Sequence, residues 1–201
     1  MGIFGALTTA VGGLRAESYA LENISGNIAN SQTTAFKRID TSFLDLIPST
    51  GLTNQLSGSV TTSSRSTNTV QGDVQSASVA TYMAINGSGF FQVAMPDGSI
   101  GYTRDGSFGL DHNGQLVTSS GYQLEPIIGV PLEAEPNSLT VTPEGLVTCR
   151  INGGVEVLGQ LELAQFGNPE GLAAIGSNTY AATVNSGAPL IGNPGANDTG
   201  L

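Results

Sequence analysis

The first thirty residues repeat apolar side chains at the spacing of one helix face. Four of them follow one another at intervals of seven, and two more widen the stripe: Leu7, Leu14, Leu21, Ile28, Val11 and Ile24. This spacing predicts a helix with the apolar seam of a coiled coil. Asn, Ser and Thr residues between positions 27 and 34 predict that the helix ends at about residues 30–35.

The apolar stripe needs a partner, because a single helix of about 25 residues cannot bury it alone. One alternative is a helix of another molecule, since this chain shows no second heptad segment. The other is that the helix packs as a surface helix on its own domain. The pattern alone favours neither alternative.

The stretch after the helix changes character. Residues 48–78 are rich in Ser, Thr, Gly and Asn and contain few apolar side chains. Such a composition predicts an extended connector over residues 39–78, with room for one short strand and no core of its own.

From about Val79 onward, short apolar runs alternate with turn dipeptides. Asn86-Gly87 is followed by Asp97-Gly98, Asp105-Gly106 and Asn113-Gly114 at eight-residue intervals. These dipeptides supply the positive φ angles of tight hairpin turns. The pattern predicts an antiparallel all-β domain over residues 79–184, so the fold class is mainly β. Residues 185–201 have almost nothing to bury and are predicted to form a flexible tail.

Composition and charge exclude several functions. The 201 residues suggest one domain with an appendage, and 16 acidic against 6 basic residues give a net charge of −10. Residues 1–40 are neutral and residues 41–201 carry the whole excess. The chain therefore lacks the basic surface that nucleic acids require. No stretch is apolar enough for a membrane span, and the first charge, Arg15, follows the apolar start, which argues against a cleavable signal peptide.

The candidate chemical residues have plainer interpretations. Asp97, Asp105 and Asp111 are spread over successive turns, where Asp is favoured for backbone reasons, whereas calcium needs several oxygens in one loop. His112 and Cys149 are the only residues of their kinds, which excludes an intrachain disulfide and disfavours a Cys/His zinc site. We expect a buried, unreactive Cys149.

An enzymatic interpretation has little support. Glu133 and Glu135 could form a hydrolytic carboxylate pair, with His112 as a further candidate, but they lie in a Pro-bounded loop without an aromatic sugar platform. Gly87-Ser-Gly89 lacks the third glycine and the helix of a phosphate loop. We therefore expect no catalytic residue, no cofactor, no metal and no small-molecule substrate.

Two segments carry sequence motifs. The first surrounds the end of the predicted helix, and its motif residues are Asn27, Ile28, Ala29, Asn30, Thr33, Phe36 and Lys37. The second runs from residue 84 to residue 122, and its motif residues are Asn86, Gly87, Gly89, Phe90, Phe91, Tyr102, Arg104, Gly106 and Phe108. In this order, after a heptad helix, they resemble the signatures of bacterial flagellar axial proteins, closest to distal rod and hook subunits. Gly26, Ala35 and Tyr82 depart from the usual pattern.

The resemblance implies a structural subunit that polymerises into the helical tube of the flagellar rod or hook. Its partners would be copies of itself, neighbouring axial proteins and the flagellar export apparatus. Export would need no cleavage of a signal peptide. The protein would be located in the periplasmic rod or the extracellular hook. Family chains continue into a second heptad helix, so this chain, which stops at Leu201, is expected to lack that helix.

One alternative to a flagellar subunit is an extracellular acidic β domain that acts as a binding or adhesion module. Such a module needs an exposed aromatic patch, for which the candidates are Tyr82, Tyr102, Tyr122 and Tyr180. The sequence does not place these tyrosines on one face.

Overall fold

The computed structural model describes residues 3–46, 59–135, 138–195 and 199–200. The chain divides into two compact units, residues 1–68 (unit 1) and residues 69–201 (unit 2). This boundary differs from the one expected at residue 78. Unit 1 contains four acidic and four basic residues, whereas unit 2 contains twelve acidic residues and two basic ones.

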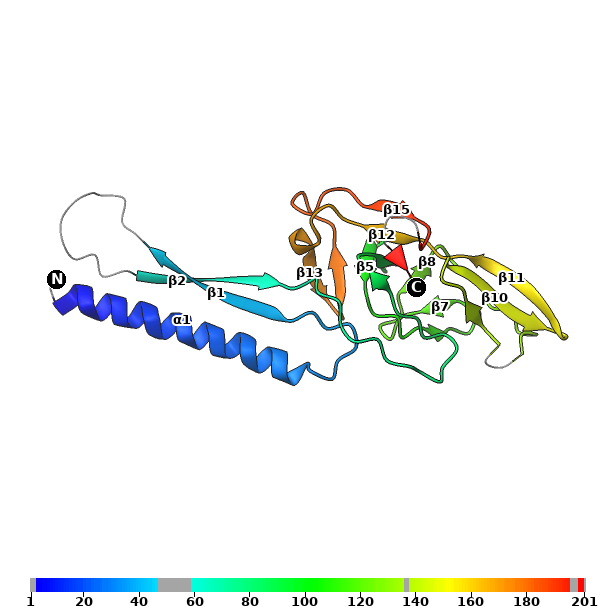
Figure 1. The fold of residues 1–201 in the computed structure, drawn as a ribbon, viewed down its shortest axis with the longest axis horizontal. Helices are drawn as coiled ribbons and strands as arrows, with labels where there is room; N and C mark the ends of the chain where they lie inside the picture. Colours follow the sequence, from blue (N-terminus) through cyan, green and yellow to red (C-terminus); the bar gives the residue numbers. More distant parts are fainter. Residues whose placement is uncertain (1–2, 47–58, 136–137, 196–198, 201) are drawn as a thin grey trace. The chain divides into compact units, whose positions relative to one another are not determined.

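Unit 1 consists of one helix and one hairpin. The helix α1 spans Ile3–Ala29, and strands β1 (Ile39–Leu46) and β2 (Ser59–Ser66) pair antiparallel, with Ile39 opposite Ser66. Figure 1 shows α1 running beside this hairpin. The amide nitrogen and the side-chain Nδ2 of Asn30 both donate to the carbonyl oxygen of Gly26, which satisfies a carbonyl of the last turn.

The hairpin corrects the expectation of an extended connector with one short strand. Two strands of eight residues each lie within residues 39–66. The Ser and Thr residues of β2 conceal the hairpin, because its sequence SVTTSSRS shows no apolar alternation. The β-branched Thr and Val residues nevertheless suit an extended backbone. Residues 47–58 of the expected connector lie outside the described residues.

Unit 2 is built from antiparallel strands, which confirms the predicted fold class. Its main sheet has the order β13-β14-β5-β4-β8-β7-β6, with β12 joining β4 and β15 joining β12. These strands are β4 (Phe90–Ala94), β5 (Ile100–Thr103), β6 (Gly109–Leu110), β7 (Leu116–Val117), β8 (Gln123–Glu125), β12 (Leu163–Gln165), β13 (Ala173–Gly176), β14 (Thr179–Ala181) and β15 (Leu190–Gly192).

Two smaller sheets complete unit 2. Strands β9 (Thr140–Val141), β10 (Leu146–Ile151) and β11 (Gly154–Gln160) form one, and β3 (Asn86–Gly87) pairs with β16 (Thr199–Gly200). A short 3-10 helix, η1, spans Pro169–Gly171. Strands β15 and β16 lie within residues 185–201, the segment expected to form a flexible tail, and they pair with β12 and β3. Residues 196–198 and 201 of that tail lie outside the described residues.

The turn dipeptides do two different things. Gly98 and Gly114 have positive φ angles of 82° and 75°, and they close the β4-β5 and β6-β7 hairpins as predicted. Asp105-Gly106 does not close a hairpin, because β5 pairs with β4 and β14 rather than with β6. A Cβ atom on Gly106 would overlap the carbonyl oxygen of Met83. Gly106 is therefore required for a close backbone approach, not for a turn.

Two apolar clusters lie in unit 2, and adjacent residues of β4 contribute to each. Phe91 belongs to the first cluster, with Ile85, Val93, Phe108, Leu116, Leu124, Ile128, Val147, Leu161 and Leu163. Phe90 belongs to the second, with Tyr102, Ala164, Phe166, Leu172 and Tyr180. Successive side chains of a strand point to opposite faces, so the two phenylalanines anchor both sides of the sheet.

Among the residues that the structure describes, no helix combines the length and the hydrophobicity that a membrane span requires.

Candidate functional site

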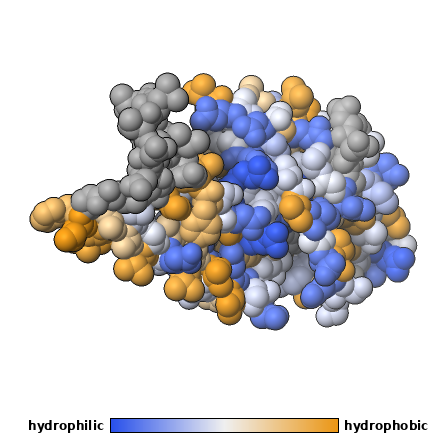
Figure 2. Space-filling view, turned by 60° about the vertical axis from the view of Figure 1, so that its left-hand side comes forward, coloured by the Kyte–Doolittle hydropathy of each residue, from blue (hydrophilic) through white to orange (hydrophobic). Residues whose placement is uncertain are grey.

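The predicted heptad stripe of α1 lies on the surface. Its four heptad residues, Leu7, Leu14, Leu21 and Ile28, are between 59% and 69% exposed, and Val11 and Ile24 are also exposed. Ile3 and Phe4 extend the apolar surface toward the start of the helix. Figure 2 shows hydrophobic surface in orange at this end of the chain. The helix therefore does not bury its stripe on its own domain, which was one of the two alternatives.

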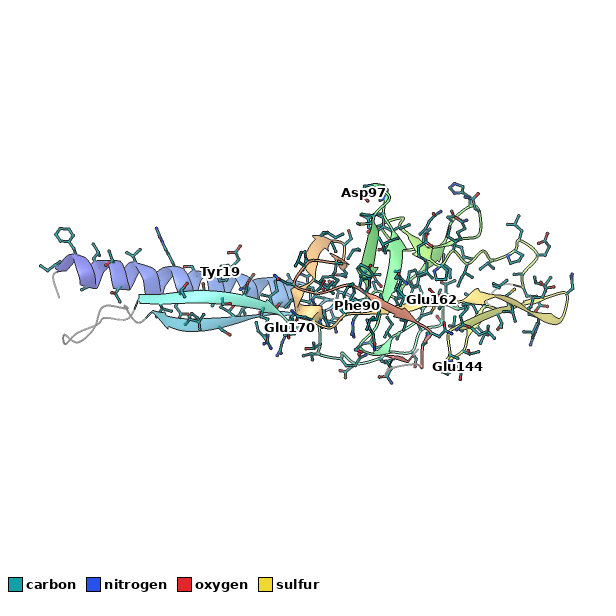
Figure 3. All side chains as sticks on the ribbon, turned by 90° about the horizontal axis from the view of Figure 1, so that it is seen from above. Tyr19, Phe90, Asp97, Glu144, Glu162 and Glu170 are labelled. Carbon is teal, nitrogen blue, oxygen red and sulfur yellow. The ribbon has the colours of Figure 1, made fainter. Side chains whose placement is uncertain are left out.

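The opposite face of α1 is the one that packs on the hairpin. Ala16 and Ala20 are buried, and their small side chains let the strands approach closely. Tyr19 donates from its hydroxyl to Ser64 Oγ at 3.0 Å, and Asn23 Nδ2 donates to Thr41 Oγ1 at 2.8 Å. Figure 3 labels Tyr19 on α1. The polar and small side of the helix is thus occupied, while the apolar side is left open.

Asn27 fixes the start of the hairpin. Its Nδ2 donates to the carbonyl oxygen of Ile39 at 2.9 Å, and its Oδ1 accepts from the amide nitrogen of Ile39 at 2.9 Å. The side-chain amide thus pairs with the backbone of Ile39 as the backbone of a neighbouring strand would. Both Asn27 and Asn30 are motif residues that could also end the helix as caps. The bond from Asn30 to Gly26 fits a cap, whereas the bonds of Asn27 reach twelve residues along the chain.

Comparison with known proteins shows which family has a chain of this kind. The flagellar basal-body rod protein FlgG of Borreliella burgdorferi is 40% identical over 97% of this chain and 80% of the relative. The chain belongs to the family of flagellar rod and hook proteins.

Other relatives agree with this assignment. FlgG of Buchnera aphidicola subsp. Schizaphis graminum is 41% identical over 94% of the chain and 78% of its own length. The flagellar hook protein FlgE of Brucella abortus is 38% identical over 76% of the chain but only 37% of its own length. A profile of the flagellar hook protein FlgE/F/G D1 domain matches residues 84–149.

The second family motif lies in the interior of unit 2. Phe90, Phe91 and Phe108 are almost fully buried, and the rings of Phe91 and Phe108 meet edge to face with centroids 5.1 Å apart. Asn86 and Gly87 form β3, and Gly89 lies between β3 and β4. Arg104 places its guanidinium carbon 4.8 Å from the centroid of Phe90. Most of the motif therefore builds the β domain.

The acidic residues at the turns accept hydrogen bonds from the backbone that follows them. Oδ1 of Asp97, Asp105 and Asp111 accepts from the amide nitrogen two residues later, at 2.8–3.0 Å. The hydrogen bond from the Ser99 side chain lowers the pKa of Asp97, and the one from the backbone of Gln115 lowers the pKa of Asp111. Within the described ranges no three potential metal ligands gather.

The remaining candidate residues stay apart. Cys149 is buried in β10, and burial raises the pKa of its thiol. Glu133 and His112 are exposed. The exposed Glu135 accepts from the amide nitrogen of Gly153 at 3.3 Å, so its carboxylate joins a loop to a hairpin.

The candidate tyrosines form no common surface patch. Tyr102 and Tyr180 are buried in the second cluster, and burial raises the pKa of both phenols. Tyr122 packs against the first cluster, and Tyr82 is exposed. The two buried tyrosines therefore cannot belong to the exposed aromatic patch that a binding or adhesion module needs.

Proposed function

We propose that the chain is a structural subunit of the flagellar rod or hook, which polymerises with copies of itself and with neighbouring axial proteins into a helical tube. The observation that carries the proposal is the exposed apolar stripe on a helix whose other face is already packed on its hairpin. Contacts between unlike surfaces that do not close into a ring produce a helical filament.

The proposal assigns different roles to the two units. The stripe residues Leu7, Val11, Leu14, Leu21, Ile24 and Ile28 form the seam between subunits, and each large side chain buried there contributes about 1.5–3 kcal/mol. Unit 1 is neutral, so the α1 helices of different copies can approach one another without charge repulsion. Unit 2 contributes the wall of the tube. The motif residues Asn27, Asn30, Thr33, Phe36 and Lys37 set the end of the helix and the path into the hairpin.

The proposal also includes the route to the flagellum. The flagellar export apparatus would carry the chain without cleaving a signal, to the periplasmic rod or the extracellular hook. A helix that is marginal in isolation suits passage as an unfolded chain, since it becomes ordered when its apolar face is covered.

Paired substitutions test the stripe. Leu14→Ser with Leu21→Ser removes the centre of the seam, and Val155→Ser with Val157→Ser removes a similarly exposed apolar pair from unit 2 as the matched control. Sedimentation velocity and electron microscopy of the full chain should show self-association for the unchanged and control proteins only. The free energy of unfolding should change by less than about 0.5 kcal/mol, because exposed side chains contribute little to the stability of the fold. Undiminished association of the stripe variant would contradict the proposal.

A further inference from the structure

Arg104 is a half-buried cation that rests on aromatic rings. It follows β5, and its guanidinium lies over the ring of Phe90 at 4.8 Å from the centroid. Phe90 in turn meets Phe166 and Tyr180 edge to face, with centroids 5.8 and 6.2 Å apart. Figure 3 shows Phe90 inside unit 2. The face of the guanidinium is therefore fixed by cation–π contact.

The hydrogen-bond donors of Arg104 are largely unused. Nη1 donates to Oε1 of Gln71 at 3.3 Å, and Gln71 is itself held by donating from Nε2 to the carbonyl oxygen of Ile85 at 3.0 Å. The Nε atom is buried and has no hydrogen-bond partner within the described ranges. Nη2 makes no hydrogen bond to the described residues and is not buried, so it faces the surface. A guanidinium has five N–H donors, and among the residues that the structure describes only the bond of Nη1 to Gln71 uses one of them.

No carboxylate of the described residues neutralises Arg104. The ion pair between Arg38 and Asp40 lies in unit 1 and does not involve Arg104. The neighbouring Asp105 turns its carboxylate to the backbone and hydroxyl of Ser107 instead. Buried arginines are almost always paired, because an unpaired buried charge is costly. Burial lowers the pKa of Arg104 from its usual value, yet a guanidinium stays charged at neutral pH.

The charge of unit 2 makes an arginine without a carboxylate partner unusual. Unit 2 has twelve acidic residues and only two basic ones, Arg104 and Arg150. A second copy of the chain therefore offers many carboxylates and almost no competing cation. Arg and Tyr are also the residues that most often dominate the binding energy of protein interfaces, and Arg104 lies beside Tyr180, with which it interacts electrostatically.

We infer that Arg104 is a receptor for an Asp or Glu carboxylate of a second copy of this chain, and that it forms an ion pair between the β domains of neighbouring subunits. The inference rests on the self-assembly proposed above. The exposed Nη2 offers a charged donor to a carboxylate of the second copy, and such charge-assisted hydrogen bonds are the stronger ones. Phe90 and Gln71 hold it in place before the partner arrives, so little conformational freedom is lost on binding.

Zero-length crosslinking tests the receptor. Arg104→Lys keeps the positive charge and places an amine that a carbodiimide can join to a carboxylate in contact with it. Self-associated protein, mixed from nitrogen-14 and nitrogen-15 chains, should give peptides in which Lys at position 104 of one copy is linked to Asp or Glu of the other. Arg150→Lys, an exposed arginine of the same unit, is the matched control. Self-associated protein in which position 104 links only within its own chain, or not at all, would overturn the inference.

Removal of the charge gives a second measurement. Arg104→Gln should weaken self-association by roughly 10- to 100-fold and reduce its dependence on salt, whereas Arg150→Gln should leave both unchanged. If the unchanged chain associates and Arg104→Gln does so equally well, this inference fails and the proposed function stands. If the unchanged chain does not associate, both fail. Thermal unfolding of Arg104→Gln checks its fold, and the crosslinking of Arg104→Lys decides the matter if that fold is lost.

Discussion

Unit 1 and unit 2 use their apolar and polar residues in opposite ways. In unit 2 the large apolar side chains, such as Phe91 and Val147, fill a buried cluster. In unit 1 the large apolar side chains, such as Leu14 and Leu21, are exposed, and small and polar ones hold helix to hairpin. Unit 2 thus has two buried apolar clusters of its own, although side chains such as Val155 and Leu132 remain exposed on it, whereas unit 1 lines up its exposed apolar residues on one face of α1.

The charges separate in the same way. Unit 1 carries equal numbers of acidic and basic residues, while unit 2 carries the net charge of the whole chain. Neutral apolar surfaces attract one another, and acidic surfaces repel. The difference teaches that attraction between copies is concentrated in unit 1, and that a contact between β domains needs a specific cation such as Arg104.

The largest difference between the two units is expected from Gly106→Ala, which should lower the stability of unit 2 alone. The added Cβ would overlap the carbonyl of Met83, whose backbone must then move and break the Met83–Gly106 hydrogen bond. We expect a loss of about 2–3 kcal/mol of unfolding free energy, measured by denaturant unfolding. Gly109→Ala is the control, because a Cβ there meets nothing within 4 Å. Equal losses in the two variants would contradict the close-approach explanation.

A smaller effect, confined to unit 1, is expected from Asn27→Ala. The substitution removes both hydrogen bonds to Ile39 and should cost about 1–2 kcal/mol, although alanine favours the helix. Hydrogen exchange at the Ile39 amide should become faster, while the amides of β4 should keep their protection. Glu22→Ala, at an exposed position on the same helix, is the control. An unchanged exchange rate at Ile39 would show that Asn27 does not hold the hairpin.

The smallest effect concerns pH. Hydrogen bonds from Gln115 and Asn113 lower the pKa of Asp111, so its contribution to stability is present above the ordinary Asp pKa of about 3.9. That contribution is lost as pH falls through the lower folded value. The melting temperature should therefore fall less steeply below about pH 4 in Asp111→Asn than in the unchanged chain. Asp73→Asn, at an exposed position outside these turns, serves as the control, and identical pH profiles for all three proteins would refute the assignment.

The regular parts of the fold were predictable from local patterns. The heptad spacing predicts α1, and Asp97-Gly98 and Asn113-Gly114 predict two hairpins that the structure contains. The pattern fails where pairing carries no apolar signal. The strand β2 is polar and hides the hairpin that it forms with β1, and β15 and β16 are short, so these strands do not stand out from loops.

The candidate site was predictable in composition but not in geometry. The stripe residues are visible in the sequence, yet which face of the helix meets the hairpin depends on Ser64 and Thr41, far along the chain. Asn27 resembles a helix cap locally, because its partner Ile39 belongs to a strand that the sequence does not reveal. The position of Arg104 over Phe90 likewise follows from the packing of β4 beside β5.

The burial of Cys149 has a practical consequence. The only thiol of the chain is enclosed in β10, and its raised pKa keeps it protonated and slow to react at neutral pH. Any cysteine placed at an exposed position, such as Leu7 or Val155, would then be the sole group that a maleimide probe modifies in the folded protein. The chain is in effect ready for single-site fluorescent or spin labelling without first removing a native residue, and each unit can be followed separately.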